Sequence, residues 1–163
     1  MNNISIIKYK KEYLFDFTRI WNDCISDGNC FYWNESFKLK TIKNIIKQQD
    51  YIGVALSNKT VVGFYLIHKN NAGRGSHIAN ALYAVDNQYR GKGIGYSLGK
   101  DSILKIEELG YQGIQFNSVV KSNTASVSLW KKLGFEIIGE IQKAFFIKED
   151  NYESIYVMYK NIK

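Results

Sequence analysis

Three glycines at alternate positions, Gly91, Gly93 and Gly95, constrain the fold of this chain more than any other feature of its sequence. They follow an apolar run at 78–85 and open a long amphipathic segment, so they fall where a strand is expected to pass into a helix. Glycine lets the backbone curl with its N–H groups turned inward, and the helix that follows adds the positive end of its dipole. The segment therefore predicts a loop that binds a pyrophosphate.

Two common phosphate-binding loops do not fit this spacing. The dinucleotide-binding pattern G-x-G-x-x-G needs a third glycine where Tyr96 or Leu98 stands. A Walker A loop needs four residues between its first glycine and its Gly-Lys pair, and the interval from Gly95 to Gly99 is one residue too short. A different kind of pyrophosphate loop is therefore expected.

A second motif lies further along the chain, between Asn123 and Phe135. Asn123 is a good helix N-cap, and Leu129 and Leu133 lie four residues apart on one helix face. Gly134 suits the left-handed end of a helix. By itself this pattern predicts no more than a capped helix on the surface.

Together and in this order, the two motifs resemble the GNAT superfamily of N-acetyltransferases. Arg90-x-x-Gly93-x-Gly95 matches the family signature R/Q-x-x-G-x-G/A, and the second motif matches N-x-x-A-x-x-L-Y-x-x-x-G-F with Trp130 at the tyrosine position. The resemblance implies acetyl-CoA as the co-substrate. Its pyrophosphate would be bound by the main chain of Arg90, Gly91, Lys92, Gly93, Ile94 and Gly95.

The apolar pattern predicts strands near 4–9, 51–55, 61–68, 78–85, 113–120, 136–142 and 154–159. It predicts helices from Tyr13 to Cys24, at about 36–49 with Ser36 as the cap, directly after the glycine loop, and from Asn123 onward. The resemblance implies an α+β fold of mixed α/β character. Its mostly antiparallel sheet of about six to seven strands splays between the fourth and fifth strands and is flanked by about four helices.

Length and composition indicate one globular domain that spans residues 1–163, because 45% of the residues are hydrophobic and no linker divides the chain. There is no apolar run of the roughly 20 residues that cross a bilayer and no signal peptide, so we expect a cytoplasmic protein without a membrane partner. The net charge of +7 is spread along the chain. No nucleic-acid-reading motif accompanies it, whereas a polyanionic ligand such as coenzyme A is compatible with it.

Cysteines and histidines form no cluster in the sequence, so no metal site is expected. Cys24 falls on the apolar face of a predicted helix, which favours a buried thiol.

The resemblance also implies where the acetyl group lies. In this family, unpaired main-chain groups of the strand before the loop bind the pantetheine arm, and here these groups belong to Ala84 and Val85. The amine attacks the thioester directly, and a main-chain N–H stabilises the oxyanion. Val85, through this N–H, and Asn123, which orients the cofactor or polarises the reacting centre, are the catalytic candidates.

Both proton-transfer positions depart from the family pattern. Trp130 replaces the tyrosine that protonates the departing sulfur, and an indole N–H does not release its proton at ordinary pH. The usual glutamate base is missing from the strand at 78–85. His77 stands at a loop edge, where a surface role is favoured over catalysis. The general acid and general base therefore stay open.

Two asparagines and an aromatic cluster are the candidate acceptor-binding residues. Asn80 and Asn117 are amides inside apolar strands, so they either hold the acceptor or make structural hydrogen bonds where the strands splay. Tyr32 and Trp33 belong to a run of aromatic residues between two helices. That run either forms a pocket wall or plugs the core.

The sequence thus predicts an enzyme that acetylates the amine of a small molecule. The segment 116–120, with Asn123, Trp130 and residues 157–159, resembles a subgroup that acetylates proline analogues, which makes an amino or imino acid the implied acceptor. The alternatives are a non-catalytic acyl-CoA-binding module and a protein or ribosomal N-terminal acetyltransferase. Pairing of the aromatic-rich C-terminal strands between subunits would give a homodimer.

Overall fold

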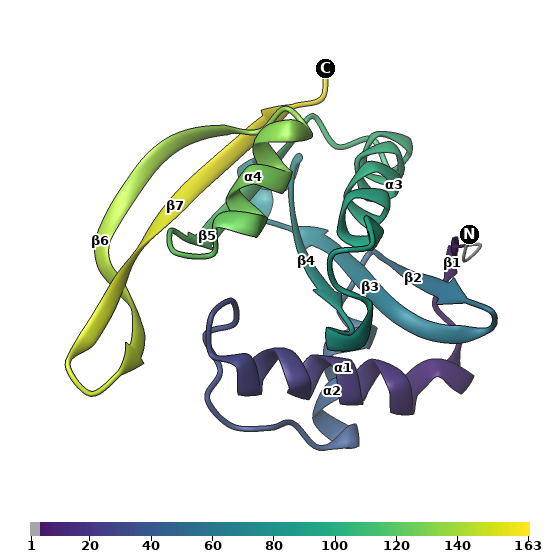
Figure 1. Ribbon diagram of the computed structural model, residues 1–163. Coiled ribbons are helices and arrows are strands. Elements are labelled where there is room, and N and C mark those ends of the chain that lie inside the picture. Colours follow the sequence, from purple (N-terminus) through teal and green to yellow (C-terminus); the bar gives the residue numbers. More distant parts are fainter. Residues whose placement is uncertain (1–3) are drawn as a thin grey trace.

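The computed structural model describes residues 4–163, which form one seven-stranded sheet with helices on both faces (Figure 1). The strand order is β1-β2-β3-β4-β5-β7-β6. The strands are β1 (Ile4–Lys8), β2 (Tyr51–Ser57), β3 (Thr60–Lys69), β4 (Ile78–Val85), β5 (Gly113–Val120), β6 (Glu136–Lys148) and β7 (Asn151–Asn161). All neighbouring pairs are antiparallel except β4 and β5.

Helices α1 (Leu14–Asp27) and α2 (Leu39–Lys47) cover one face of the sheet, and α3 (Ile94–Glu108) and α4 (Thr124–Lys132) cover the other (Figure 1). Short 3-10 turns lie at Lys11–Tyr13, Gly73–Gly75 and Asn87–Tyr89. The predicted mixed, mostly antiparallel sheet with about four helices is confirmed. No helix in the described residues is long and apolar enough to cross a bilayer.

Several element boundaries differ from the sequence-based expectation. α2 begins at Leu39, and its N-cap is Lys38 without a side-chain hydrogen bond, so the prediction of Ser36 as the cap was wrong. β6 and β7 are also longer than expected and form an arm that turns at Glu149 and Asp150 (Figure 1). Polar residues at 151–153 hid the start of β7 from the apolar pattern, whereas β6 is interrupted by a register shift between Ile141 and Phe145, where Lys143 has a φ of 51°.

Alternation of side chains along the strands builds a separate core on each face of the sheet. On the α1 face, Phe17 stacks on Phe64 of β3 with ring centroids 3.7 Å apart, and Trp21 lies 6.0 Å from the same ring. On the α4 face, Trp130 lies 4.6 Å from Phe116 of β5. Both cores position strands β3 to β5, which carry the candidate site.

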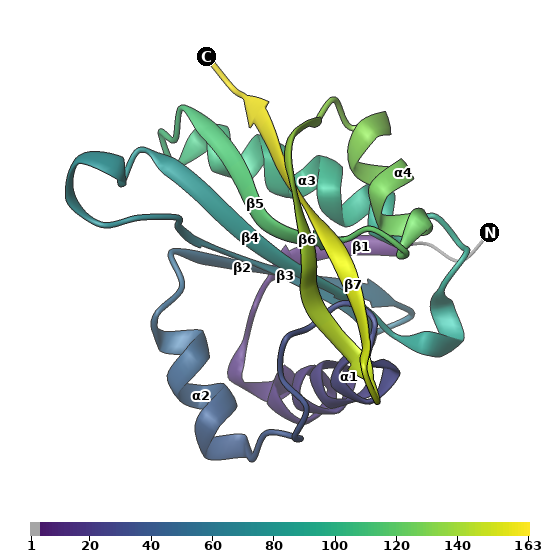
Figure 2. The ribbon, with the colours of Figure 1, turned by 90° about the vertical axis from the view of Figure 1, so that its left-hand side faces the viewer.

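The sheet opens between β4 and β5. Only two residue pairs join these strands, Ile78 with Gly113 and Ala79 with Ile114. Beyond them β4 stays paired with β3, and β5 stays paired with β7 as far as Val120, so the two strands diverge (Figure 1). Figure 2 shows the same sheet from the side, with β4 between β3 and β5. The predicted splay is therefore present, and it leaves the β5-facing edge of β4 without a strand partner.

The close approach of β3 to β4 can be tested at Gly63. A Cβ at this position would lie 2.8 Å from the carbonyl oxygen of Ala84, a backbone atom with little freedom to move. We expect Gly63→Ala to lower the free energy of unfolding by about 1–3 kcal/mol in urea titrations, as overpacking usually does. Gly139→Ala is the control, because nothing lies within 4 Å of its Cβ position. Equal stability of the two variants would contradict this packing.

Candidate active site

The glycine loop ends as the N-terminus of α3. Gly91 and Gly93 have φ angles of 74° and 79°, in the left-handed region that glycine adopts without strain. The first helical bond runs from the N–H of Ser97 to the carbonyl of Gly93. Within the described chain, the N–H groups of residues 93–96 donate to no backbone carbonyl. They are the free N–H groups of a helix start, where the dipole also favours an anion.

Two ion pairs fix this loop to α1. Asp86, which is buried, accepts a hydrogen bond from Arg19 at 2.6 Å and also caps the turn through the N–H of Gln88 at 2.9 Å. The guanidinium of Arg90 donates to Asp27 at 2.5 Å. Arg90 therefore directs its side chain toward α1, and only its main chain belongs to the loop surface.

The open edge of β4 presents main-chain groups of alternate residues. The N–H of Asp86 donates to Val62 of β3, so the N–H groups of Val85 and Tyr83 face the opposite way, toward β5. Ala84 pairs with Phe64, and its carbonyl oxygen is turned toward β3. Of the two residues predicted to bind pantetheine, only Val85 thus faces the opening. Tyr83, which sequence reasoning did not single out, faces it as well.

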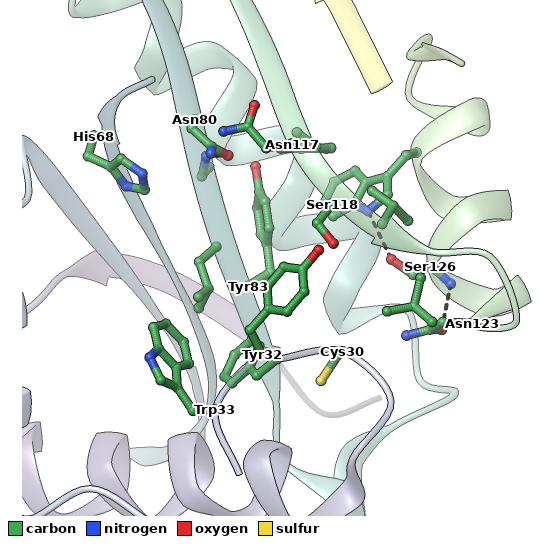
Figure 3. A pocket seen from close by; sticks show the side chains of 17 residues that line it. Cys30, Tyr32, Trp33, His68, Asn80, Tyr83, Asn117, Ser118, Asn123 and Ser126 are labelled. Atoms are coloured by element: carbon green, nitrogen blue, oxygen red, sulfur yellow. Dashed lines mark hydrogen bonds between the residues drawn. The ribbon is translucent and has the colours of Figure 1, made fainter. Parts of the chain in front are cut away.

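A cavity of about 390 Å³ occupies the opening between β4 and β5 and reaches both faces of the sheet (Figure 3). On the α4 face it is lined by Tyr83, Ser126 and Trp130, and on the α1 face by Tyr32, Trp33, His68 and Leu82. Asn123 lies at the α4 end, and Asn80 and Asn117 lie at the opposite end. Ala84 and Val85 lie outside it, toward the glycine loop.

On the α4 face of the cavity, the polar side chains are hydrogen-bonded to one another or to neighbouring groups, and none of them is a general acid. Asn123 accepts from the N–H of Ser126 at 3.2 Å, which confirms it as the cap of α4. The indole N–H of Trp130 donates to the Ser126 hydroxyl at 2.9 Å. Tyr83 bonds Ser102 at 2.8 Å, and burial raises the pKa of this phenol. Neither aromatic side chain is an acid near neutral pH.

The side chains of Asn80 and Asn117 are both hydrogen-bonded to a third side-chain amide, that of Asn70. Asn80 and Asn117 both donate to the side-chain oxygen of Asn70, at 3.3 and 2.7 Å, and so bridge the diverging strands. Their own oxygens accept from the N–H of Ala81 at 2.8 Å and from Gln115 at 2.9 Å. Both therefore have structural partners and also line the cavity.

His68 is the site residue that sequence reasoning missed. It pairs with Asn80 across β3 and β4 and lines the cavity, whereas His77 is exposed and lies outside it. Gln49 donates to the carbonyl of Ile45 at 2.8 Å, which turns its side-chain oxygen to Nδ1 of His68 at 3.2 Å. The neutral ring therefore carries its proton on Nδ1 and leaves Nε2 as an acceptor.

The environment of His68 favours the neutral ring. Burial lowers the pKa of His68, and the nearby carboxylate of Asp50 opposes this shift only in part. His68 falls at the end of the strand predicted at 61–68, but the register between β3 and β4 is what places it opposite Asn80. Single-strand patterns do not contain that register.

The aromatic run after α1 serves both roles that the sequence left open. Phe31 is buried and packs on Trp21 with ring centroids 5.3 Å apart. Tyr32 and Trp33 line the cavity while remaining 59% and 40% exposed. Tyr32 also packs on Phe145 of the β6–β7 arm at 5.4 Å, and its phenol reaches toward Ser118 (Figure 3). The buried hydroxyl of Ser118 has no partner among the described residues.

A splayed mixed sheet, free N–H groups at a helix start beside the splay, and a cavity across it are the features that acetyl-CoA-dependent acyltransferases of the GNAT type combine. The sequence model of the acetyltransferase (GNAT) family matches residues 9–135. The chain therefore belongs to the acetyltransferase (GNAT) family, and the predicted enzyme class is confirmed at the level of the family.

Two curated proteins of Schizosaccharomyces pombe are similar in sequence. N-acetyltransferase aca1 is 32% identical over 99 residues, which are 60% of this chain and 47% of that protein, so the match spans about half of its length. N-alpha-acetyltransferase 30 is 25% identical over 160 residues, which cover 97% of this chain and 99% of that protein.

Solved structures share the fold. A GCN5-related N-acetyltransferase from Kribbella flavida aligns with a TM-score of 0.91 and 26% identity, covering 97% of each chain. A phosphinothricin acetyltransferase from Sinorhizobium meliloti, solved in complex with AcCoA, aligns with a TM-score of 0.91 and 18% identity, covering 99% of this chain and 89% of that one. At that identity, the second likeness concerns the fold alone.

The amide bridge at Asn70 can be tested by stability. Asn70→Ala removes one oxygen that accepts two hydrogen bonds, so we expect a loss of about 1–2 kcal/mol in the free energy of unfolding. Asn70→Asp keeps an accepting oxygen and should lose less. The exposed neighbour Asn71 serves as a control, since Asn71→Ala should change stability by no more than about 0.5 kcal/mol. Indistinguishable losses at positions 70 and 71 would argue against the bridge.

Proposed function

We propose that this protein transfers the acetyl group of acetyl-CoA to the amine of a small acceptor. The observation that carries the proposal is the glycine loop, whose free N–H groups at the start of α3 lie next to the opening between β4 and β5. A pyrophosphate fits such a site because the N–H groups and the helix dipole both favour it. Acetyl-CoA would supply an activated acetyl group, and the remaining chemistry falls to residues of this chain.

The main chain from Arg90 to Gly95 is our proposed pyrophosphate site, with Asn123 beside the acyl end. The N–H of Val85 faces the open edge near the loop, where the pantetheine arm would lie. We assign oxyanion stabilisation to the N–H of Tyr83, because Tyr83 faces the same edge and also borders the cavity. Ala84 is left with a packing role, since its main chain faces β3.

His68 is our proposed general base. The tautomer fixed by Gln49 leaves Nε2 free to accept the amine proton, directly or through a water. The indole of Trp130 is committed to Ser126, so the sulfur departs without protonation by residue 130. A thiol leaving group has an ordinary pKa near 8.5, which makes this departure feasible.

Loss of the loop geometry should weaken cofactor binding. Gly93→Ala places a Cβ at a φ of 79°, which costs about 1–2 kcal/mol and turns the N–H groups of the first helical turn. We expect calorimetry to show at least about a tenfold weaker affinity for acetyl-CoA. Gly110→Ala is the matched control, because Gly110 has a similar φ of 84° and equally open surroundings at the other end of α3. Equal weakening by both variants would exclude the loop as the binding site.

The role of His68 predicts a pH dependence with a defined sign. Because the base must be neutral, kcat at saturating acceptor should fall as pH drops through the pKa of His68, which burial places below the ordinary value of about 6.5. His68→Gln should lower kcat about 100-fold and remove this acid limb. His77→Gln changes an exposed histidine outside the cavity and should leave the profile intact. An acid limb that persists in His68→Gln would assign the base elsewhere.

A second candidate function is acetylation of protein N-termini. It is supported by the similarity to N-alpha-acetyltransferase 30, which extends over nearly the whole of both chains. Thiol release from acetyl-CoA should be measured with small amines and with peptides that have free N-termini, ribosomal sequences included. Turnover with peptides alone would favour this candidate, and tight binding without turnover would favour a non-catalytic module. A cytoplasmic location is part of the proposal.

A further inference from the structure

The cavity between β4 and β5 is free of formal charge. Among the 17 described residues that line it, none is Asp, Glu, Lys or Arg. Its ionisable members are Cys30, Tyr32, His68 and Tyr83. Contact with Cys24 and burial raise the pKa of the Cys30 thiol, and burial raises that of Tyr83 and lowers that of His68. These three groups are therefore neutral near pH 7.

An uncharged cavity discriminates against a carboxylate on the acceptor. A buried carboxylate needs a cation or several donors, because the free-energy cost of its desolvation is otherwise not offset. Arg19 of α1 and Arg90 of the glycine loop are paired with Asp86 and Asp27, and the Lys92 ammonium donates to the carbonyl of Gln88. Asn80 and Asn117 each commit a donor to Asn70. An amino or imino acid, the acceptor that the resemblance implied, finds no charge partner here.

Aromatic side chains line the cavity on both faces of the sheet. Tyr32 and Trp33 are large side chains that remain 59% and 40% exposed at its edge, so their rings are available to a ligand. Phe116 and Trp130 lie buried on its opposite side. Between them, Ser118 presents a buried hydroxyl without a partner among the described residues. Flat apolar rings and single neutral donors match an aromatic molecule with few polar groups.

We infer that the acceptor is an aralkylamine, an alkyl amine that bears an aromatic ring and no carboxylate, held between the Tyr32–Trp33 edge and the opening where His68 lies. The inference rests on the proposed acetyl transfer. In that reaction the amine nitrogen forms a bond to the acetyl carbonyl carbon, the carbon–sulfur bond breaks, and its electron pair leaves with the sulfur. The amine proton passes to Nε2 of His68 and then to the solvent or the thiolate.

Matched acceptors test the inference on the intact protein. Thiol release from acetyl-CoA should be followed with phenylalanine, phenylalaninamide and 2-phenylethylamine, which share the ring and differ at the carboxylate. We expect kcat/KM for the amide and the amine to exceed that for phenylalanine by at least about 100-fold, as burial of an unpaired charge predicts. Tryptamine against tryptophan repeats the comparison. Isopentylamine replaces the ring by an aliphatic group and should be about tenfold poorer than 2-phenylethylamine.

The outcomes separate the two proposals. Equal or better turnover of phenylalanine or proline overturns the inference and leaves acetyl transfer intact. Turnover of isopentylamine equal to that of 2-phenylethylamine overturns the aromatic part. Peptide turnover without turnover of free amines overturns the inference in favour of N-terminal acetylation. Absence of thiol release with every acceptor overturns the proposed function itself, and the inference with it.

A pair of variants at position 117 provides an independent readout. Asn117 is exposed at the cavity edge, and both replacements alter its hydrogen bonds to Asn70 and Gln115. Asn117→Lys supplies the missing cation and should narrow the preference for phenylalaninamide over phenylalanine by about tenfold, whereas Asn117→Asp should widen it. Identical preferences in the two variants would place the acceptor away from this cavity.

Discussion

The parting of β4 from β5 is the constraint on which the rest of the structure depends. Two residue pairs join the strands, after which each keeps only its other neighbour. Backbone N–H and C=O groups that leave a sheet need other partners. Asn80 supplies one of them by accepting from the N–H of Ala81, and the N–H groups of Tyr83 and Val85 face the opening. The gap is therefore both the origin of the cavity and a source of donors.

The two faces of the sheet contribute different halves of the site because side chains alternate along β4. Leu82 packs with the core under α1, and Tyr83 packs with the core under α3 and α4, yet both line the same cavity. An intact strand pair would separate these environments. With the pair open, one cavity reaches both faces of the sheet, which is the proximity that the proposed direct transfer requires.

Ion pairs connect the glycine loop to α1, whereas uncharged groups line the cavity. Asp86 and Arg90 fix the glycine loop to α1 through Arg19 and Asp27. This arrangement holds the loop N–H groups beside the opening and leaves the guanidinium groups of Arg19 and Arg90 paired with carboxylates. It also leaves the cavity dependent on aromatic surface, hydroxyls and amides, for which shape and hydrogen bonding decide selectivity. Tyr32, which belongs to that surface, packs on Phe145 of the β6–β7 arm, a segment distant in the sequence.

Local sequence determined the strand-loop-helix unit around Gly93, the cap at Asn123 and the order of elements, because each depends on residues close together in the chain. The splay between the fourth and fifth strands was predicted from the family resemblance. Only the tertiary structure decided which main-chain groups of β4 face the opening, that Asn70 joins Asn80 to Asn117, and that His68 rather than His77 borders the cavity. These features depend on register and on contacts between distant segments, which no local pattern contains.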